Sequence, residues 1–208
     1  MLLLCSLWVS EPVTAQGRAS VLLILGDSLS AGYGLAPEEA WPVLLGQRLA
    51  TTEHRAEVIN ASISGETTAG GLARLPALLE AHRPDVVVIE LGANDGLRGL
   101  PIAQVRSNLL ALARTSRAAG AQVVVLPMRV PPNYGPVYAK AFDALYAELP
   151  QQVEGVSLSP FFLRDVALDP ALLQADGLHP VAAAQPKMLE AVWPALEAAL
   201  RQTRQGKP

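Results

Sequence analysis

Three side chains have the chemical types that acyl transfer requires, one near the start of the chain and two near its end. Ser28 supplies a hydroxyl, His179 supplies an imidazole, and Asp176 supplies a carboxylate three residues before that imidazole. A serine hydroxyl is a weak nucleophile at neutral pH, so an imidazole has to take its proton and a carboxylate has to fix the imidazole tautomer. The short spacing between Asp176 and His179 allows one turn to bring the carboxylate to the ring. These residues predict a nucleophile, its base and an orienting acid.

The sequence also offers donors for the negative charge that acyl transfer creates on the carbonyl oxygen. Suitable groups are the backbone N–H of Ser28, the backbone N–H of Gly65 and the side-chain amide of Asn94. We therefore expect these three residues to form an oxyanion hole. Each has a structural alternative: Ser28, like Asp176, can cap a helix, Asn94 can satisfy a turn, and Gly65 can supply unusual backbone angles.

Apolar runs rich in β-branched residues predict the strands that position these side chains. Continuous runs of this kind are typical of strands covered on both faces of a parallel sheet. The predicted strands span residues 21–25, 57–61, 86–91 and 123–126, with a weaker strand at 156–158. Apolar residues at helical spacing predict helices over residues 41–49, 72–82, 102–119, 138–149 and 181–200.

Strands and helices therefore alternate along the whole chain. This order predicts an α/β fold: a three-layer α/β/α sandwich around a doubly wound, five-stranded parallel sheet. Active sites of such sheets lie in the crevice beyond the carboxyl ends of the strands. The segments that carry Ser28, Gly65 and Asn94 each follow a predicted strand, and His179 lies at the start of the predicted last helix.

The length of 208 residues predicts one domain, which we place at residues 21–208 after a leader at residues 1–20. Residues 2–9 are an apolar run, and the small residues at 13–15 suit cleavage by signal peptidase after Ala15. We expect a periplasmic or secreted protein. The run is short and no Lys or Arg precedes it, so a truncated signal and a misassigned start stay open, and lipidation at Cys5 is a weaker alternative.

Composition excludes several classes of function. The formal net charge is −3 and there is no block of Lys or Arg, so we do not expect a nucleic acid partner. The single cysteine, Cys5, rules out an intrachain disulfide and a cysteine zinc cluster. The predicted chemistry requires no metal or cofactor. We expect a monomer without stable membrane insertion.

The candidate catalytic and oxyanion-hole residues occur in four blocks that resemble those of the SGNH, or GDSL, hydrolases. The blocks are residues 26–30, Gly65, residues 92–95 and residues 176–180, in the order of that family. Within the family, the chain is most similar to the bacterial periplasmic thioesterase I, lysophospholipase and arylesterase group. That likeness rests on residues 25–33, 60–65, 91–98 and 132–135.

The resemblance implies a flavodoxin-like fold and the catalytic and oxyanion-hole roles given above for Ser28, Asp176, His179, Gly65 and Asn94. Glu66, which stands where close relatives more usually have Asp, leaves the donor at Gly65 intact. An α/β-hydrolase would instead carry its serine in a G-x-S-x-G elbow near the middle of the chain, which is absent here.

The predicted activity is hydrolysis of carboxylic esters or thioesters, such as acyl-CoA, lysophospholipid or aryl esters, through an acyl-enzyme on Ser28. One alternative keeps this chemistry but uses acetylated carbohydrate or cell-wall polymer as substrate. Another is an inactive binding module that kept the fold. We place Val130 and Pro131, which follow the fourth predicted strand, in the wall of the acyl pocket.

Other polar residues are expected to have structural roles. Asp27 and Asp95 flank the predicted site and should support it through hydrogen bonds. Glu90 lies inside an apolar strand and must find a donor if it is buried. His54 and His82 lie near helix ends and are expected to be solvated.

Overall fold

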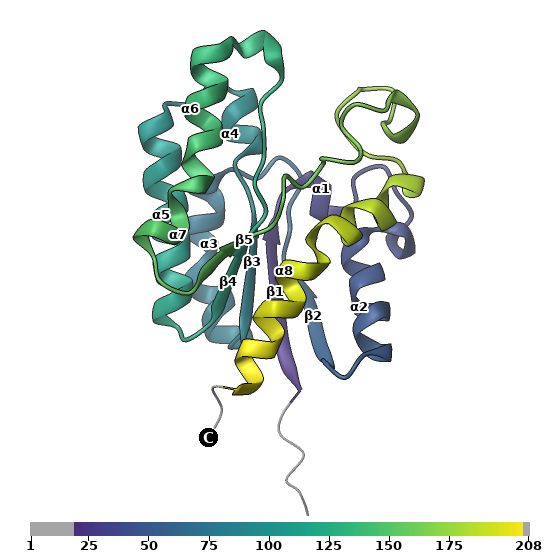
Figure 1. Cartoon of the computed structure of the whole chain (residues 1–208), viewed down its shortest axis with the longest axis vertical. Coiled ribbons are helices and arrows are strands. Elements are labelled where there is room, and N and C mark those ends of the chain that lie inside the picture. The colour runs from purple at the N-terminus through teal and green to yellow at the C-terminus, as the bar shows by residue number, and fades with distance from the viewer. Residues whose placement is uncertain (1–18, 206–208) are drawn as a thin grey trace, which may run out of the picture.

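The structure, a computed structural model, describes residues 19–205, which form one sheet of five parallel strands with helices on both faces (Figure 1). The strand order is β2-β1-β3-β4-β5. This confirms the predicted α/β/α sandwich and gives the flavodoxin-like order. The strands are β1 (Ser20–Gly26), β2 (Ala56–Asn60), β3 (Val86–Glu90), β4 (Gln122–Val125) and β5 (Val156–Leu158).

Burial on both faces explains the uninterrupted apolar runs of the central strands. Residues 22–25 of β1 and 86–89 of β3 all have 0% exposed surface. Helices α3 (Thr68–His82) and α5 (Ile102–Ala118) cover one face of the sheet, and α2 (Trp41–Thr51) and α8 (Gln185–Gln205) cover the other (Figure 1). Because both faces of the sheet are covered, polar side chains on the central strands reach solvent only at the strand ends.

The remaining helices are short or lie at the ends of the layers. They are α1 (Ser28–Ala31), α4 (Ala93–Leu97), α6 (Pro136–Ala147) and α7 (Leu149–Gln152), with 3-10 turns at Pro37–Glu39, Pro132–Tyr134, Pro170–Leu172 and Ala182–Ala184. The predicted helix over residues 138–149 is divided into α6 and α7. Pro150, at the start of α7, has no backbone N–H to continue the first helix.

The predicted start of the last helix, at residue 181, is wrong. Helix α8 begins at Gln185, and Ala182–Ala184 form a 3-10 turn before it. The segment that carries His179 is a loop, held by an antiparallel bridge between Leu173 and Pro180. Asp176 therefore caps no helix, and the connection between β5 and α8 carries both Asp176 and His179.

The sheet brings the ends of β1 and β3 together although Glu90 lies 64 positions after Gly26 in the sequence. These strands are neighbours, with Gly26 opposite Glu90. The chain leaves β1 toward β2 on one side and β3 toward β4 on the other, so their carboxyl ends flank the point where the strand order reverses. Helices α1 and α4 both start from this edge (Figure 1).

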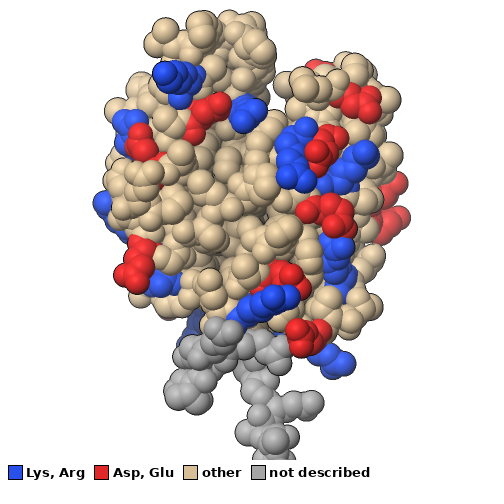
Figure 2. Space-filling view, viewed as in Figure 1, with Lys and Arg blue, Asp and Glu red and all other residues tan. Residues whose placement is uncertain are grey.

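Charged side chains of both signs are interspersed over the face shown in Figure 2. Ion pairs such as Arg106 with Glu148, at 2.9 Å, and Arg201 with Glu197, at 3.0 Å, join neighbouring elements or turns. Within residues 19–205, no helix has the length and apolar character needed to cross a bilayer. The predicted leader falls outside the described residues except for Ala19 and Ser20, and Ser20 already belongs to β1.

Candidate active site

The fold brings Ser28, His179 and Asp176 into one hydrogen-bonded chain. His179 Nε2 lies 2.9 Å from Ser28 Oγ, and His179 Nδ1 lies 2.6 Å from Asp176 Oδ2. Ser28 and His179 are both half-buried, so a substrate can reach the hydroxyl from solvent. In this geometry the imidazole can take the serine proton at Nε2 while the carboxylate holds the proton on Nδ1.

Asp176 is fixed by its own loop as well as by the imidazole. Its Oδ1 accepts the backbone N–H groups of Leu178, at 2.9 Å, and His179, at 3.0 Å, while Gly177 adopts a left-handed φ of 68°. The backbone and side-chain hydrogen bonds from His179, with that from Leu178, lower the pKa of Asp176 from 3.8 to about 2. The carboxylate therefore stays charged over the whole range in which the imidazole can act as a base.

Ser28 is the first residue of helix α1 and not its cap. Asp27 occupies the cap position, and its Oδ1 accepts the N–H of Leu29 at 3.0 Å. The first N–H groups of a helix have no acceptor within the helix, so the Ser28 N–H points out of the helix start. The helix-cap alternative for Ser28 is therefore wrong, and the cap interaction instead fixes the turn that presents its hydroxyl.

Gly65 and Asn94 lie in the neighbouring segments. Gly65 has a φ of 81°, and a Cβ built there meets no atom within 4 Å, so the backbone angle and not crowding requires glycine. Asn94, in α4, donates through Nδ2 to Asp27 Oδ2 at 3.1 Å and to the carbonyl of Glu66 at 3.0 Å. Asn94 therefore joins the ends of β1, β2 and β3.

Tyr33, Gln174 and Arg98 also contact the site, and the sequence pattern does not predict these contacts. The Tyr33 ring lies 4.5 Å from the His179 ring, centre to centre, and the Gln174 amide donates to the Tyr33 carbonyl at 2.9 Å. Arg98 donates to the Gly65 carbonyl at 3.0 Å. No local pattern marks these contacts, because each joins segments that are distant in the sequence.

Asp95 and Glu90 have the supporting contacts that their positions predicted. Asp95 is buried and accepts the N–H and hydroxyl of Thr68, at 2.9 and 2.6 Å, which ties α4 to the start of α3. Glu90 is fully buried and accepts the Ser30 hydroxyl at 2.8 Å. The expectation that a buried Glu90 finds a donor is confirmed.

Val130 lies beside α4. Val130 is buried, and its Cγ1 would be only 2.5 Å from a Cβ at Gly96, which is two residues after Asn94. Pro131 is half-buried. The assignment of both residues to an acyl pocket stays a prediction.

The expectation that His54 is solvated is wrong. Its exposed fraction is 6%, and the ring packs beside Glu197 and Arg201 of α8. The end of α2 folds against the last helix, which the helical spacing of α2 alone does not reveal. His82 is half-buried.

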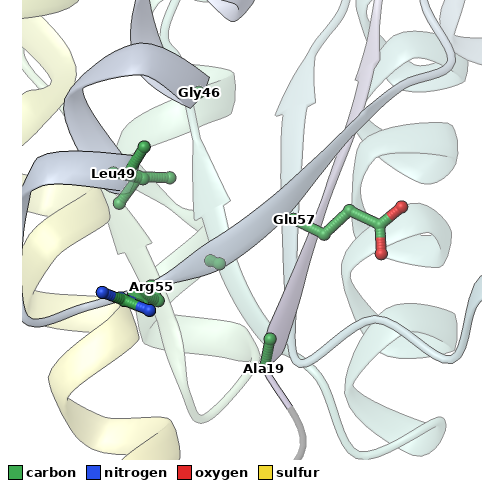
Figure 3. A pocket seen from close by; sticks show the side chains of 7 residues that line it. Ala19, Gly46, Leu49, Arg55 and Glu57 are labelled. Carbon is green, nitrogen blue, oxygen red and sulfur yellow. The ribbon is translucent and has the colours of Figure 1, made fainter.

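A shallow hollow of about 400 Å³ lies at the opposite end of the sheet (Figure 3). It opens beside the first residues of β1 and β2, whereas the Ser28 segment follows the last residues of β1. The seven residues of β1 span about 20 Å, so the hollow is remote from Ser28. The residues that line it are Ala19, Gly46, Leu49, Ala50, Arg55, Ala56 and Glu57.

The sequence was compared with known protein families, curated proteins and solved structures, and the matches agree on one family. Residues 24–185 match the model of the GDSL-like Lipase/Acylhydrolase family. The chain is 51% identical to Esterase TesA of Pseudomonas aeruginosa over 185 residues, which cover 89% of this chain and 92% of that protein. It is 47% identical to Thioesterase 1/protease 1/lysophospholipase L1 of Escherichia coli over 168 residues, which cover 81% of this chain and 79% of the relative.

The fold agrees with that of a solved relative. A crystal structure of a protein named TesA superposes with a TM-score of 0.84 at 51% sequence identity. The superposition covers 86% of this chain and 99% of the other.

Proposed function

Because this chain belongs to the GDSL-like lipase and acylhydrolase family and is a carboxylic ester hydrolase, we propose that Ser28 is the nucleophile of that reaction. His179 is its base and Asp176 orients the base. The observation that carries this proposal is the 2.9 Å contact between Ser28 Oγ and His179 Nε2, across 151 residues of sequence. A distance of this kind is the geometric requirement for a serine activated by histidine.

Acylation begins when Ser28 Oγ attacks the carbonyl carbon of the substrate. The serine proton passes to His179 Nε2, and the former carbonyl oxygen carries the negative charge of a tetrahedral intermediate. When this intermediate collapses, the carbon–oxygen or carbon–sulfur bond to the leaving group breaks, and the leaving alcohol or thiol takes the proton from His179. The acyl group remains on Ser28 as an ester.

Deacylation repeats these steps with water as the nucleophile. His179 takes a proton from water as the oxygen attacks the acyl carbon, and it returns that proton to Ser28 Oγ as the carboxylic acid leaves. Throughout the cycle Asp176 accepts the hydrogen of Nδ1 at 2.6 Å and stabilises the imidazolium that forms.

The oxyanion hole consists of the N–H groups of Ser28 and Gly65 and the Asn94 amide. Both hydrogens of Asn94 Nδ2 already have acceptors, namely Asp27 and the Glu66 carbonyl. The Asp27 carboxylate is the stronger acceptor when it is charged, so the substrate oxyanion replaces the Glu66 carbonyl and the bond to Asp27 is retained. Asp27 thereby aims the amide during turnover.

Asn94→Ala removes the side-chain donor without touching Ser28 or His179. We expect kcat for a p-nitrophenyl ester to fall by about 10²- to 10³-fold, because the lost hydrogen bond acts on charge that develops in the transition state. Steady-state kinetics with purified protein measures this change. A variant in which KM rises while kcat stays at the wild-type value would show that Asn94 binds the substrate ground state instead.

The substrates are acyl esters and acyl thioesters. The Escherichia coli relative is named for thioester and lysophospholipid hydrolysis, and the half-buried Ser28 is reachable from solvent. The direct test is release of p-nitrophenol from short- and medium-chain esters and of free thiol from acyl-CoA. If neither product appears and a fluorophosphonate does not label Ser28, the proposed mechanism is wrong.

Val130 forms part of the wall that limits the acyl chain. Val130→Ala removes two carbon atoms beside Gly96, so we expect the ratio of kcat/KM for longer over shorter acyl esters to rise. A chain-length series of p-nitrophenyl esters measures this ratio. Val137→Ala is the matched control, because Val137 is 84% exposed at the start of α6. An unchanged ratio in Val130→Ala would remove this residue from the pocket.

We further propose that the protein acts outside the cytoplasm, on the strength of the apolar run at residues 2–9 and the small residues before Gln16. Mass spectrometry of the protein from a periplasmic fraction tests this. Cleavage after Ala15 supports export, and retention of an uncleaved chain in the cytoplasm contradicts it.

A further inference from the structure

Two buried carboxyl groups, those of Glu90 and Asp27, lie at the turn that carries Ser28. Glu90 ends β3 with 0% exposed surface, and Asp27 follows β1 with 1%. The sheet register sets Gly26 opposite Glu90, and a Cβ at Gly26 would lie 2.8 Å from Glu90 Oε2. Only glycine leaves room for this carboxyl group beneath the turn that presents Ser28.

The two oxygens of Glu90 have unequal surroundings. Oε2 accepts the Asp27 backbone N–H at 3.2 Å and the Ser30 hydroxyl at 2.8 Å. The Ser30 oxygen in turn accepts Trp41 Nε1 at 3.2 Å, so its own hydrogen is committed to Glu90. Oε1 is buried and receives no hydrogen bond from the described residues. A charged carboxylate with one bare, buried oxygen would be costly, whereas a neutral acid with its proton on that oxygen carries no charge.

Asp27 has the opposite environment. Its Oδ1 accepts the Leu29 N–H at 3.0 Å, and its Oδ2 accepts the Asn94 amide at 3.1 Å. Donors to both oxygens stabilise the charged form of a carboxyl group. If the pair holds one proton and one negative charge, the proton belongs on Glu90 and the charge on Asp27.

We propose that Glu90 is a positioning residue that acts as a neutral carboxylic acid at neutral pH, holding the charged Asp27 so that Asp27 aims the Asn94 amide at the oxyanion. This inference rests on the proposed function, because it assigns the support of the same oxyanion hole. Glu90 itself touches no reacting atom. It connects the nucleophile turn, through Ser30 and the Asp27 N–H, to the end of β3.

The charges that face the pair agree with this assignment. Burial raises the pKa of Glu90 well above 4.5, and the negative charge of Asp27 raises it further. Burial also raises the pKa of Asp27, from 3.8 to about 6, against the hydrogen bonds and the His179 charge that lower it. The buried phenol of Tyr146, which donates to the Leu91 carbonyl, and the carboxylate of Asp95 add no positive charge that would favour a second anion.

The expected dependence of turnover on pH follows from the pair. On the acid side Asp27 takes up a proton near pH 6, and the neutral carboxyl group is then no longer a stronger acceptor for the Asn94 amide than the Glu66 carbonyl. On the alkaline side Glu90 loses its proton, and two adjacent buried anions repel each other and displace Asp27. Between these limits the pair holds a single proton.

Two substitutions separate a neutral acid from a merely structural side chain. Glu90→Ala removes the support, and we expect kcat to fall about 10- to 100-fold, since small displacements of a catalytic group cost that much. Glu90→Gln keeps the size and the neutral hydrogen-bonding group, so it is expected to restore most of kcat and to abolish the decline on the alkaline side. Glu148→Gln, in the half-buried ion pair with Arg106 that is remote in sequence from the nucleophile turn, is the control and should keep the wild-type pH profile.

Infrared spectroscopy of the whole protein tests the proton directly and does not depend on activity. At neutral pH we expect a protonated-carboxyl band that is present in wild type and in Glu148→Gln and missing in Glu90→Gln. The proposal is overturned if that band is the same in wild type and Glu90→Gln, or if Glu90→Gln is as slow as Glu90→Ala. Failure of the proposed function would appear separately, as activity that survives loss of Ser28 whatever the infrared result.

Discussion

Ser28→Ala is expected to lower kcat for p-nitrophenyl esters by about 10⁴-fold or more, since removal of a triad nucleophile leaves only binding and oxyanion stabilisation. The variant keeps the backbone N–H of residue 28 and the Asp27 cap on Leu29, so the oxyanion hole and the turn should survive. Stopped or continuous assays of p-nitrophenol release measure the loss. Circular dichroism checks that the fold is intact.

Covalent labelling gives this prediction a second readout. A fluorophosphonate should add one phosphonyl group to the wild-type chain and none to Ser28→Ala. Ser116→Ala is the matched control, because Ser116 lies in α5 and its hydroxyl donates only to the Leu112 carbonyl among the described contacts. If Ser28→Ala is labelled as fast as Ser116→Ala, or hydrolyses the ester at a similar rate, another nucleophile performs the reaction.

Asp176→Asn is expected to lower kcat by about 10³- to 10⁴-fold, by the loss of the imidazole tautomer that an anionic partner enforces. Asparagine retains an oxygen that can accept the N–H groups of Leu178 and His179, so the loop should keep its shape. Its amide hydrogens, however, would face His179 Nδ1 where the wild type has an acceptor 2.6 Å away. The imidazole then places its remaining hydrogen on the nitrogen that faces Ser28.

The pKa of Asp176 sets the sign of the pH dependence. Because hydrogen bonds lower this pKa from 3.8 to about 2, the charged form is fully present above pH 3.8 and is lost only as the pH falls through about 2. A decline in wild-type turnover between pH 4 and 7 therefore belongs to other groups, including Asp27.

A matched aspartate provides the control for Asp176→Asn. Asp169 is also exposed, lies in the same long connection and accepts the N–H of the residue two positions on, Ala171, at 3.0 Å. It has no contact with an imidazole in the structure. Asp169→Asn is expected to keep wild-type turnover, and an equal loss in both variants would mean that loop shape, and not the charge on residue 176, controls the rate.

The strands and the fold class were predictable because burial on both faces of a strand requires a continuous run of apolar residues in the sequence. Residues such as Leu22 and Val88 have no exposed surface, so selection for apolar side chains runs unbroken through β1 and β3. The rule that sites follow strand ends then placed Ser28 and Asn94 on one edge. The start of α8 was missed because Ala182–Ala184 form a 3-10 turn, which apolar spacing does not distinguish from the first turn of a helix.

The sequence by itself determined which chemical groups are available, in what order they occur, and that strand ends deliver them. Only the tertiary structure decided which groups touch: the Glu90 carboxyl under Asp27, the Asn94 amide between Asp27 and Glu66, and His54 against α8. The physical reason is that side-chain periodicity reports whether a residue is buried, whereas the partner of a buried polar group is set by strand order and register. Gly26 and Glu90 meet because β1 and β3 are neighbours, and no local pattern in either strand records that pairing.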